Sequence, residues 1–218
     1  IEELILDLTR SFNNDYEPTH SRRDVASYRP YFLGPVVTFS SEGVRFLVDG
    51  QQRMTSLSLL MSYMSSLLEQ GDSQTQLKNL IYSTQYGQTT FTIDVPEREN
   101  VMTAIREGSE NPPLEMDQSS QVIWERYSDI RNIFPEELTG EVLPFFVDWV
   151  LNRVVLVDIG TTDKDMALEI FESMNDRGLQ LSNMDILKSY LLSRIGYPDE
   201  IERANQVWRE TTQSLKNF

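Results

Sequence analysis

The change of pattern that decides the fold lies in VRFLVDGQQRMTSLSLLMSYMSSLL, residues 44–68. Its first five residues are mostly β-branched, aromatic or aliphatic, which is typical of a short strand. Beyond Gly50 the apolar residues recur at helical spacing as far as Leu68, so the stretch predicts a strand, a tight bend and then a helix. We interpret the methionine-rich apolar face of this helix as core packing rather than as a cofactor site.

The flanking sequence supplies a partner for that strand. Residues 31–39 predict a turn that runs into a strand, and the polar residues 40–43 predict a hairpin connection to residues 44–48. Upstream, residues 1–15 predict an amphipathic helix and residues 22–27 a short one. Downstream, the sequence predicts strands at 89–93 and 153–159, helices at 97–107, 119–133 and 141–152, and further helices from 162, 182 and 199.

Few strands among many helices predict an α+β fold, with a small sheet core and a large, mostly helical remainder. We expect a single domain over residues 1–218, with a core at 1–70 and 153–195 and a helical insertion at about 94–152. The segment 108–113 is the best candidate for an internal loop. Because the sequence lacks an initiator Met, we expect it to be a fragment of a longer chain.

Composition excludes several kinds of site. The 218 residues contain no cysteine, which excludes disulfides, thiolate zinc sites and cysteine nucleophiles. The single histidine, His20, lies in a polar stretch and is expected to be a solvated loop residue rather than a catalytic one. No apolar run is long enough to cross a bilayer, so a cytoplasmic setting without a membrane partner is expected.

The formal net charge of −15 argues against a general nucleic-acid-binding surface. Residues 94–176 carry 19 acidic and 6 basic residues, whereas the flanking regions are nearly neutral. We therefore expect any anionic ligand to bind in the flanking regions, and we do not expect DNA to wrap around this chain alone.

The strongest candidate site is Asp49-Gly50-Gln51-Gln52-Arg53, at the predicted junction of strand and helix. A helix N-terminus presents unpaired N–H groups, Gly50 leaves room for a phosphate, and Arg53 could donate charged hydrogen bonds. Asp49 could hold a metal ion or orient a water. A purely structural interpretation makes Asp49 the N-cap and Gln52 its capping-box partner, and from the residues alone it is slightly favoured.

A second candidate lies in residues 171–188, where a polar corner, Asn175-Asp176-Arg177-Gly178, separates two predicted helices. Asn175 and Arg177 could lie beside a ligand, with Lys188 one turn into the following helix. A structural interpretation makes Gly178 a helix stop and Ser182 with Asp185 a capping box.

Together, these two stretches and Tyr31-Phe32-Leu33-Gly34 resemble the N-terminal domain family of GmrSD-type restriction proteins, in the same order along nearly the whole chain. The resemblance implies a ParB/sulfiredoxin-like core in a bacterial protein that defends against phage or foreign DNA. It also implies binding of a nucleoside triphosphate, base unknown, with Mg²⁺, and its hydrolysis. Asp49, Gly50, Gln51, Gln52 and Arg53 would form the nucleotide site, with Asp49 and Arg53 catalytic and Asp49 on the metal.

In the same resemblance, Asn175, Arg177, Gly178, Asp185 and Lys188 match the second motif. The implied partners are the nucleotide, an HNH-type nuclease domain in the same or another chain, DNA in the full-length protein, and a second copy of the chain in a homodimer.

The sequence departs from the family pattern at two points. It lacks an Ile-Pro-x-Tyr-Gln-Arg-like segment before the first helix, and it contains no HNH pattern, so this chain alone is not expected to cut DNA. The leading prediction is a nucleotide-hydrolysing sensor and regulatory domain of a modification-dependent restriction system. The alternative is a non-catalytic module that binds DNA or a partner nuclease.

Overall fold

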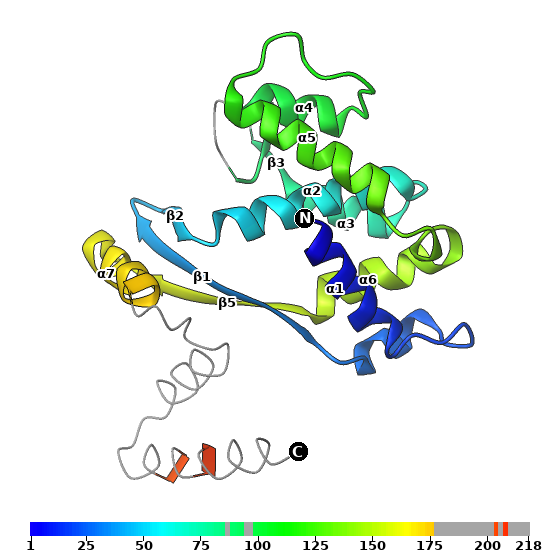
Figure 1. Ribbon diagram of the computed structural model, residues 1–218, viewed down its shortest axis with the longest axis horizontal. Coiled ribbons are helices and arrows are strands. Elements are labelled where there is room, and N and C mark those ends of the chain that lie inside the picture. Colours follow the sequence, from blue (N-terminus) through cyan, green and yellow to red (C-terminus); the bar gives the residue numbers. More distant parts are fainter. Residues whose placement is uncertain (86–87, 94–97, 177–202, 205–206, 209–218) are drawn as a thin grey trace. The chain divides into compact units, whose positions relative to one another are not determined.

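A computed structural model describes residues 1–85, 88–93, 98–176, 203–204 and 207–208. The chain forms two compact units (Figure 1). The first comprises Ile1–Leu33 and Gly50–Leu156, and the second comprises Gly34–Asp49 and Val157–Phe218. The predicted α+β class, a small sheet with a helical remainder, is confirmed.

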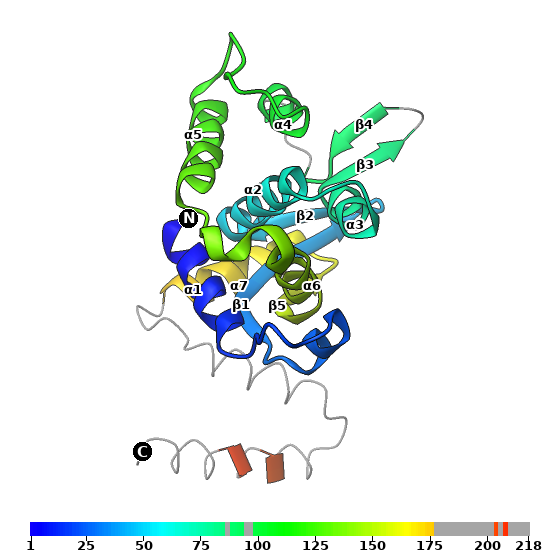
Figure 2. The ribbon, with the colours of Figure 1, turned by 90° about the vertical axis from the view of Figure 1, so that its right-hand side faces the viewer.

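The first unit is mainly helical. Its elements are α1 (Glu2–Asn13), the 3-10 helix η1 (Arg22–Ser27), α2 (Gln51–Leu67), α3 (Asp72–Ile81), a hairpin of β3 (Tyr82–Gln85) and β4 (Gln88–Phe91), α4 (Glu99–Arg106), α5 (Gln118–Ile133), the short 3-10 helices η3 (Glu136–Leu138) and η4 (Gly140–Val142), and α6 (Leu143–Arg153). Figure 2 shows α4 and α5 as neighbours, joined by a long loop. The helices predicted at 1–15, 22–27, 119–133 and 141–152 are confirmed within a few residues.

Aromatic rings form the centre of the first unit. The Phe12 ring of α1 lies 5.2 Å from that of Phe146 and 5.9 Å from that of Trp149, both on α6. The indole Nε1 of Trp149 donates a hydrogen bond of 3.1 Å to the backbone oxygen of Arg29, so this buried polar group is satisfied. These contacts fix α1 against α6.

The second unit contains most of a three-stranded mixed sheet in the order β2-β1-β5. Its strands are β1 (Tyr31–Ser41), β2 (Val44–Asp49) and β5 (Val154–Thr161). The antiparallel β1–β2 pair turns through Glu42 and Gly43, whose φ values of 51° and 79° are those of a type I′ turn. The hairpin predicted from residues 40–43 is therefore confirmed, and α7 (Lys164–Asp176) packs against β2.

Two local expectations differ from the structure. The strand expected at 89–93 is Gln88–Phe91. α3 and β3 lie in a region for which the residue periodicity predicts no particular element. The sequence predicts that α7 begins at Thr162, but the carboxylate of Asp163 accepts the N–H groups of Asp165 and Met166 at 2.8 and 3.2 Å. Asp163 therefore caps this helix. The helices predicted from 182 and 199 lie outside the described ranges.

Candidate functional site

The motif begins where the chain leaves β2 at Asp49. Gly50 adopts φ 91° and ψ 8°, a left-handed conformation that favours glycine, and α2 begins at Gln51. The backbone N–H of Met54 donates to the oxygen of Gly50 at 2.9 Å, which closes the first helical turn. The N-cap residue is thus Gly50 and not Asp49, so the capping-box interpretation of the motif does not describe this bend.

The five motif residues differ in position. Gly50 is buried, Asp49 and Arg53 are half-buried, and Gln51 and Gln52 are exposed. Asp49 ends a strand of the second unit, whereas the other four belong to the first. Gln51 and Gln52 line a pocket of the first unit, and Arg53 is not among the residues that line it. The structure therefore brings two motif side chains into a cavity, and the roles of Asp49 and Arg53 stay predictions.

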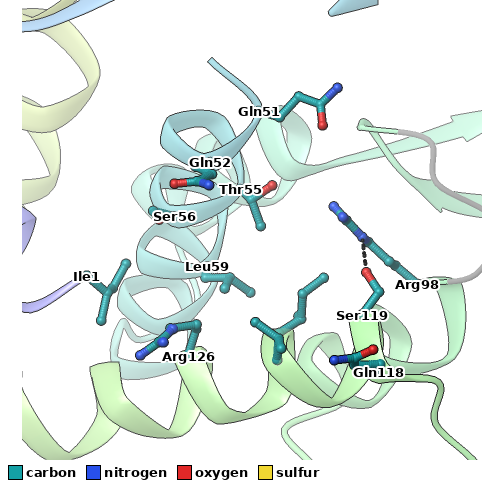
Figure 3. A pocket seen from close by; sticks show the side chains of 12 residues that line it. Ile1, Gln51, Gln52, Thr55, Ser56, Leu59, Arg98, Gln118, Ser119 and Arg126 are labelled. Carbon is teal, nitrogen blue, oxygen red and sulfur yellow. Dashed lines mark hydrogen bonds between the residues drawn. The ribbon is translucent and has the colours of Figure 1, made fainter. Parts of the chain in front are cut away.

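The pocket has a volume of about 870 Å³ and lies between α2 and α5 (Figure 3). Ligand pockets typically measure roughly 300–1,000 Å³. α2 forms one wall with Gln51, Gln52, Thr55, Ser56 and Leu59; α5 forms the other with Gln118, Ser119, Val122, Ile123 and Arg126. Arg98, which directly precedes α4, and Ile1 complete the lining.

The two walls use the same spacing. On each helix the lining residues fall at positions i, i+1, i+4, i+5 and i+8, which is one continuous helical face. Because α2 packs on α5, these two faces meet across the pocket. Leu59 and Ile123 are buried at 1% and 4% exposure, so the floor is apolar and the rim carries amides, hydroxyls and guanidinium groups.

Among the described residues, those that line the pocket include two arginines and no carboxylate. The Nε of Arg98 donates a hydrogen bond of 3.0 Å to the Oγ of Ser119, and Figure 3 shows this side chain reaching toward the part of the pocket where Gln51 and Thr55 lie. Arg126 makes an ion pair of 2.9 Å with Asp129, one turn further along α5. The lining itself is therefore cationic, although the surrounding sequence is acidic.

A carboxylate lies just beyond the rim. Asp117 caps α5 by accepting the N–H of Ser120 at 2.8 Å, and this hydrogen bond is the main reason that the pKa of Asp117 lies below its ordinary value. The nearby Arg98 lowers this pKa further. Asp117 is consequently ionised at neutral pH and partly offsets the positive charge of Arg98.

The structure restricts how a cation could be held. Among the described residues, no group of three or more His, Asp or Glu side chains could form a cage for a metal ion. Mg²⁺, however, is commonly held by one or two carboxylates together with substrate phosphates and water. The role of Asp49 as a ligand of Mg²⁺ therefore stays a prediction.

Other candidates from the sequence have separate outcomes. Asn175 lies in the last turn of α7, while Arg177, Gly178, Asp185 and Lys188 lie outside the described residues. His20 is half-buried, and its Nδ1 lies 2.8 Å from the hydroxyl of Tyr28. It lies in a loop, as expected, and its ring is partly exposed but held against Tyr28 rather than freely solvated.

Sequence reasoning did not identify Arg98, Ser119 or Arg126. Arg98 and Arg126 are far from the motif along the chain, and only the packing of α2 on α5 brings them to the same cavity. The one available signal is the repeated spacing on α5, which becomes informative once its partner helix is known.

The sequence profile of the GmrSD restriction endonuclease N-terminal domain matches residues 1–192, and the chain belongs to this family. Membership associates it with a restriction system. No curated protein and no solved structure matches the chain, so the ParB/sulfiredoxin-like likeness remains an expectation.

None of the helices in the described ranges combines the length and apolar character needed to cross a membrane.

Proposed function

We propose that this chain binds and hydrolyses a nucleoside triphosphate, as the sensor and regulatory domain of a modification-dependent restriction system. Family membership supports the restriction setting. The observation that carries the nucleotide assignment is that Gln51 and Gln52 of the motif line a pocket whose described lining contains two arginines and no carboxylate. Such a lining favours an anionic ligand.

The motif residues have distinct roles in this proposal. Backbone N–H groups at the start of α2 bind phosphate oxygens, and Arg53 neutralises charge that develops during hydrolysis. Asp49 holds Mg²⁺ or orients the attacking water; Mg²⁺, when bound, neutralises phosphate charge and polarises the terminal phosphate. Asn175, Arg177 and Lys188 are proposed to contact the same ligand from the second motif.

The partners follow from the same proposal. The chain acts with an HNH-type nuclease domain, in the same or another polypeptide, and that nuclease cuts DNA in the full-length system. The regulatory domain is proposed to act in the cytoplasm and to form a homodimer. Its own net charge of −15 agrees with DNA contact being made mainly by other parts of the system.

Calorimetric titration with each of four nucleoside triphosphates and Mg²⁺ tests the assignment. We expect the chain to bind at least one of them, and Arg53→Ala to weaken that binding about tenfold or more, because a charge-assisted hydrogen bond contributes about 1.5–3 kcal/mol. Arg23→Ala is the matched control, since Arg23 is exposed on η1 and does not line the pocket. Phosphate release then separates hydrolysis from binding.

Unchanged affinity in the Arg53→Ala variant would remove Arg53 from the site. Salt-dependent binding of modified DNA, with no nucleotide binding and no phosphate release, would instead support the non-catalytic alternative.

A further inference from the structure

We infer that the α5 wall is the second half of the nucleotide site, and that Arg98 and Arg126 hold the phosphate chain of the triphosphate while the apolar floor receives the nucleoside. This inference rests on the proposed function and deepens it. Neither arginine belongs to either of the two family motifs, and both line the same cavity as Gln51 and Gln52.

The positions of the two arginines favour an extended ligand. Arg98 is bound to Ser119, near the start of α5, whereas Arg126 lies seven residues further along that helix. At 1.5 Å per residue, the backbone positions of Ser119 and Arg126 are about 10 Å apart along the axis of α5, so the two arginines act at different positions along this wall. A triphosphate with its nucleoside is long enough to extend from one arginine toward the other.

Arg98 is held ready for an anion. Its Nε–Ser119 bond of 3.0 Å uses one of the five N–H donors of the guanidinium and fixes the orientation of the group. A preoriented guanidinium loses less side-chain entropy on binding than a freely rotating one.

Arg126 is held by a weaker arrangement. Its ion pair with Asp129 has side-chain exposures of 57% and 44%, and exposed pairs at this spacing stabilise a helix only slightly. A phosphate oxygen can therefore compete with Asp129 for Arg126. Removing the carboxylate should strengthen ligand binding, a result that a purely structural role for Arg126 does not predict.

The floor distinguishes a nucleotide from a bare polyphosphate. Val122 lines the pocket and is 46% exposed, an unusual position for an aliphatic side chain beside two arginines. Leu59 and Ile123, which are almost fully buried, complete the apolar lining of the floor, and Val122 provides its exposed surface. Covering this surface with a base or sugar is favourable in water, whereas inorganic tripolyphosphate gains nothing from it.

Titrations of the whole chain with the nucleoside triphosphate that it binds, and separately with inorganic tripolyphosphate, test these assignments. We expect Arg98→Gln and Arg126→Gln each to lower the affinity for both ligands about tenfold or more. Arg131→Gln, the matched control on the same helix, should stay within about twofold, because Arg131 does not line the pocket. Asp129→Asn should raise the affinity for both ligands, and Val122→Ser should lower the affinity for the nucleotide alone.

The outcomes separate the two proposals. If the wild-type chain binds nucleotide and the Arg98→Gln and Arg126→Gln variants match the Arg131→Gln control, the α5 wall is excluded and the proposed function stands. If the wild type binds only tripolyphosphate, and Arg98→Gln and Arg126→Gln lower that affinity, the nucleotide function is overturned and the anion site remains. If it binds neither ligand, both are overturned. Circular dichroism and thermal melting of each variant confirm that an affinity change is not a loss of folding.

Discussion

The first unit buries a cluster of aromatic rings, whereas the described part of the second unit buries few large side chains. Phe12, Phe146 and Trp149 are each at most 1% exposed in the first unit. In the second, Val36 and Val37 on β1 are buried, while Phe46 on β2 is 44% exposed and makes its ring contact, with Phe39, across the hairpin. The first unit is thus stabilised by buried aromatic packing, whereas the second is stabilised by contacts between side chains on a partly exposed sheet face.

The ion pairs follow the same division. In the first unit Arg22 binds Asp148 through two N–H groups and also donates to Ser73, so it joins η1, α6 and α3. In the second unit Arg45 makes a single contact of 2.9 Å with Asp158, which also accepts the hydroxyl of Thr38 at 2.7 Å. This difference predicts that substitutions in the first unit cost more stability than comparable ones in the second.

The largest expected effect is that of Phe12→Ala. It removes a fully buried ring that contacts four other aromatic side chains, and should lower the free energy of unfolding by about 3–5 kcal/mol. Phe46→Ala, the matched change in the second unit, should cost below about 1.5 kcal/mol. Denaturant unfolding followed by tryptophan fluorescence and by amide exchange of β1 and β2 measures both. Equal losses of unfolding free energy in the two variants would contradict the proposed difference between the units.

Double-mutant cycles on the two ion pairs should give intermediate values. We expect a coupling energy of about 1–2 kcal/mol for Arg22 with Asp148, because the contact is bidentate and the Asp148 side chain is only 17% exposed. The corresponding energy for Arg45 with Asp158 should be below about 1 kcal/mol, since their exposures are 66% and 37%. A stronger coupling in the second unit would reverse the proposed order.

The smallest effect concerns the pH dependence of the first unit. The Arg29 side chain, through its hydrogen bond, holds the pKa of Asp15 below the ordinary value of 3.8. A lowered folded-state pKa stabilises the native protein above the unfolded value, and that stabilisation is lost as pH falls through the folded value. Wild type should therefore exceed Asp15→Asn in Tm near neutral pH, and the difference should shrink below about pH 3.8. A difference that grows on acidification would contradict this sign.

Local pattern was sufficient for much of the fold. The β1–β2 hairpin has strands rich in β-branched and aromatic residues on either side of the Glu42-Gly43 turn, and α2 begins directly after the glycine that follows β2. α3 was missed because its buried face includes Ser73, which receives a hydrogen bond of 2.8 Å from Arg22, while Leu80 is 54% exposed. A polar residue inside and an apolar one outside conceal the helical period.

The candidate site was predictable only on one wall. Gln51 and Gln52 belong to a contiguous motif, so the amino-acid sequence alone is enough to single them out. Arg98 and Arg126 depend on the packing of two helices that are far apart along the chain. The spacing on α5 becomes informative only once α2 is known to pack against it, because Val122 and Ile123 interrupt the polar positions of that face. The α5 wall of the pocket depends on tertiary packing, which local sequence patterns do not reveal.

The backbone at Gly50 has a consequence for mutational scanning. With φ at 91°, any L-residue at this position incurs a conformational penalty of about 1–2 kcal/mol, whether or not a ligand ever binds. A library screened for activity will therefore record position 50 as intolerant for reasons of chain geometry. Tolerance at Gln51 and Gln52, where the backbone is helical and the side chains are exposed, is the better reporter of what the pocket recognises.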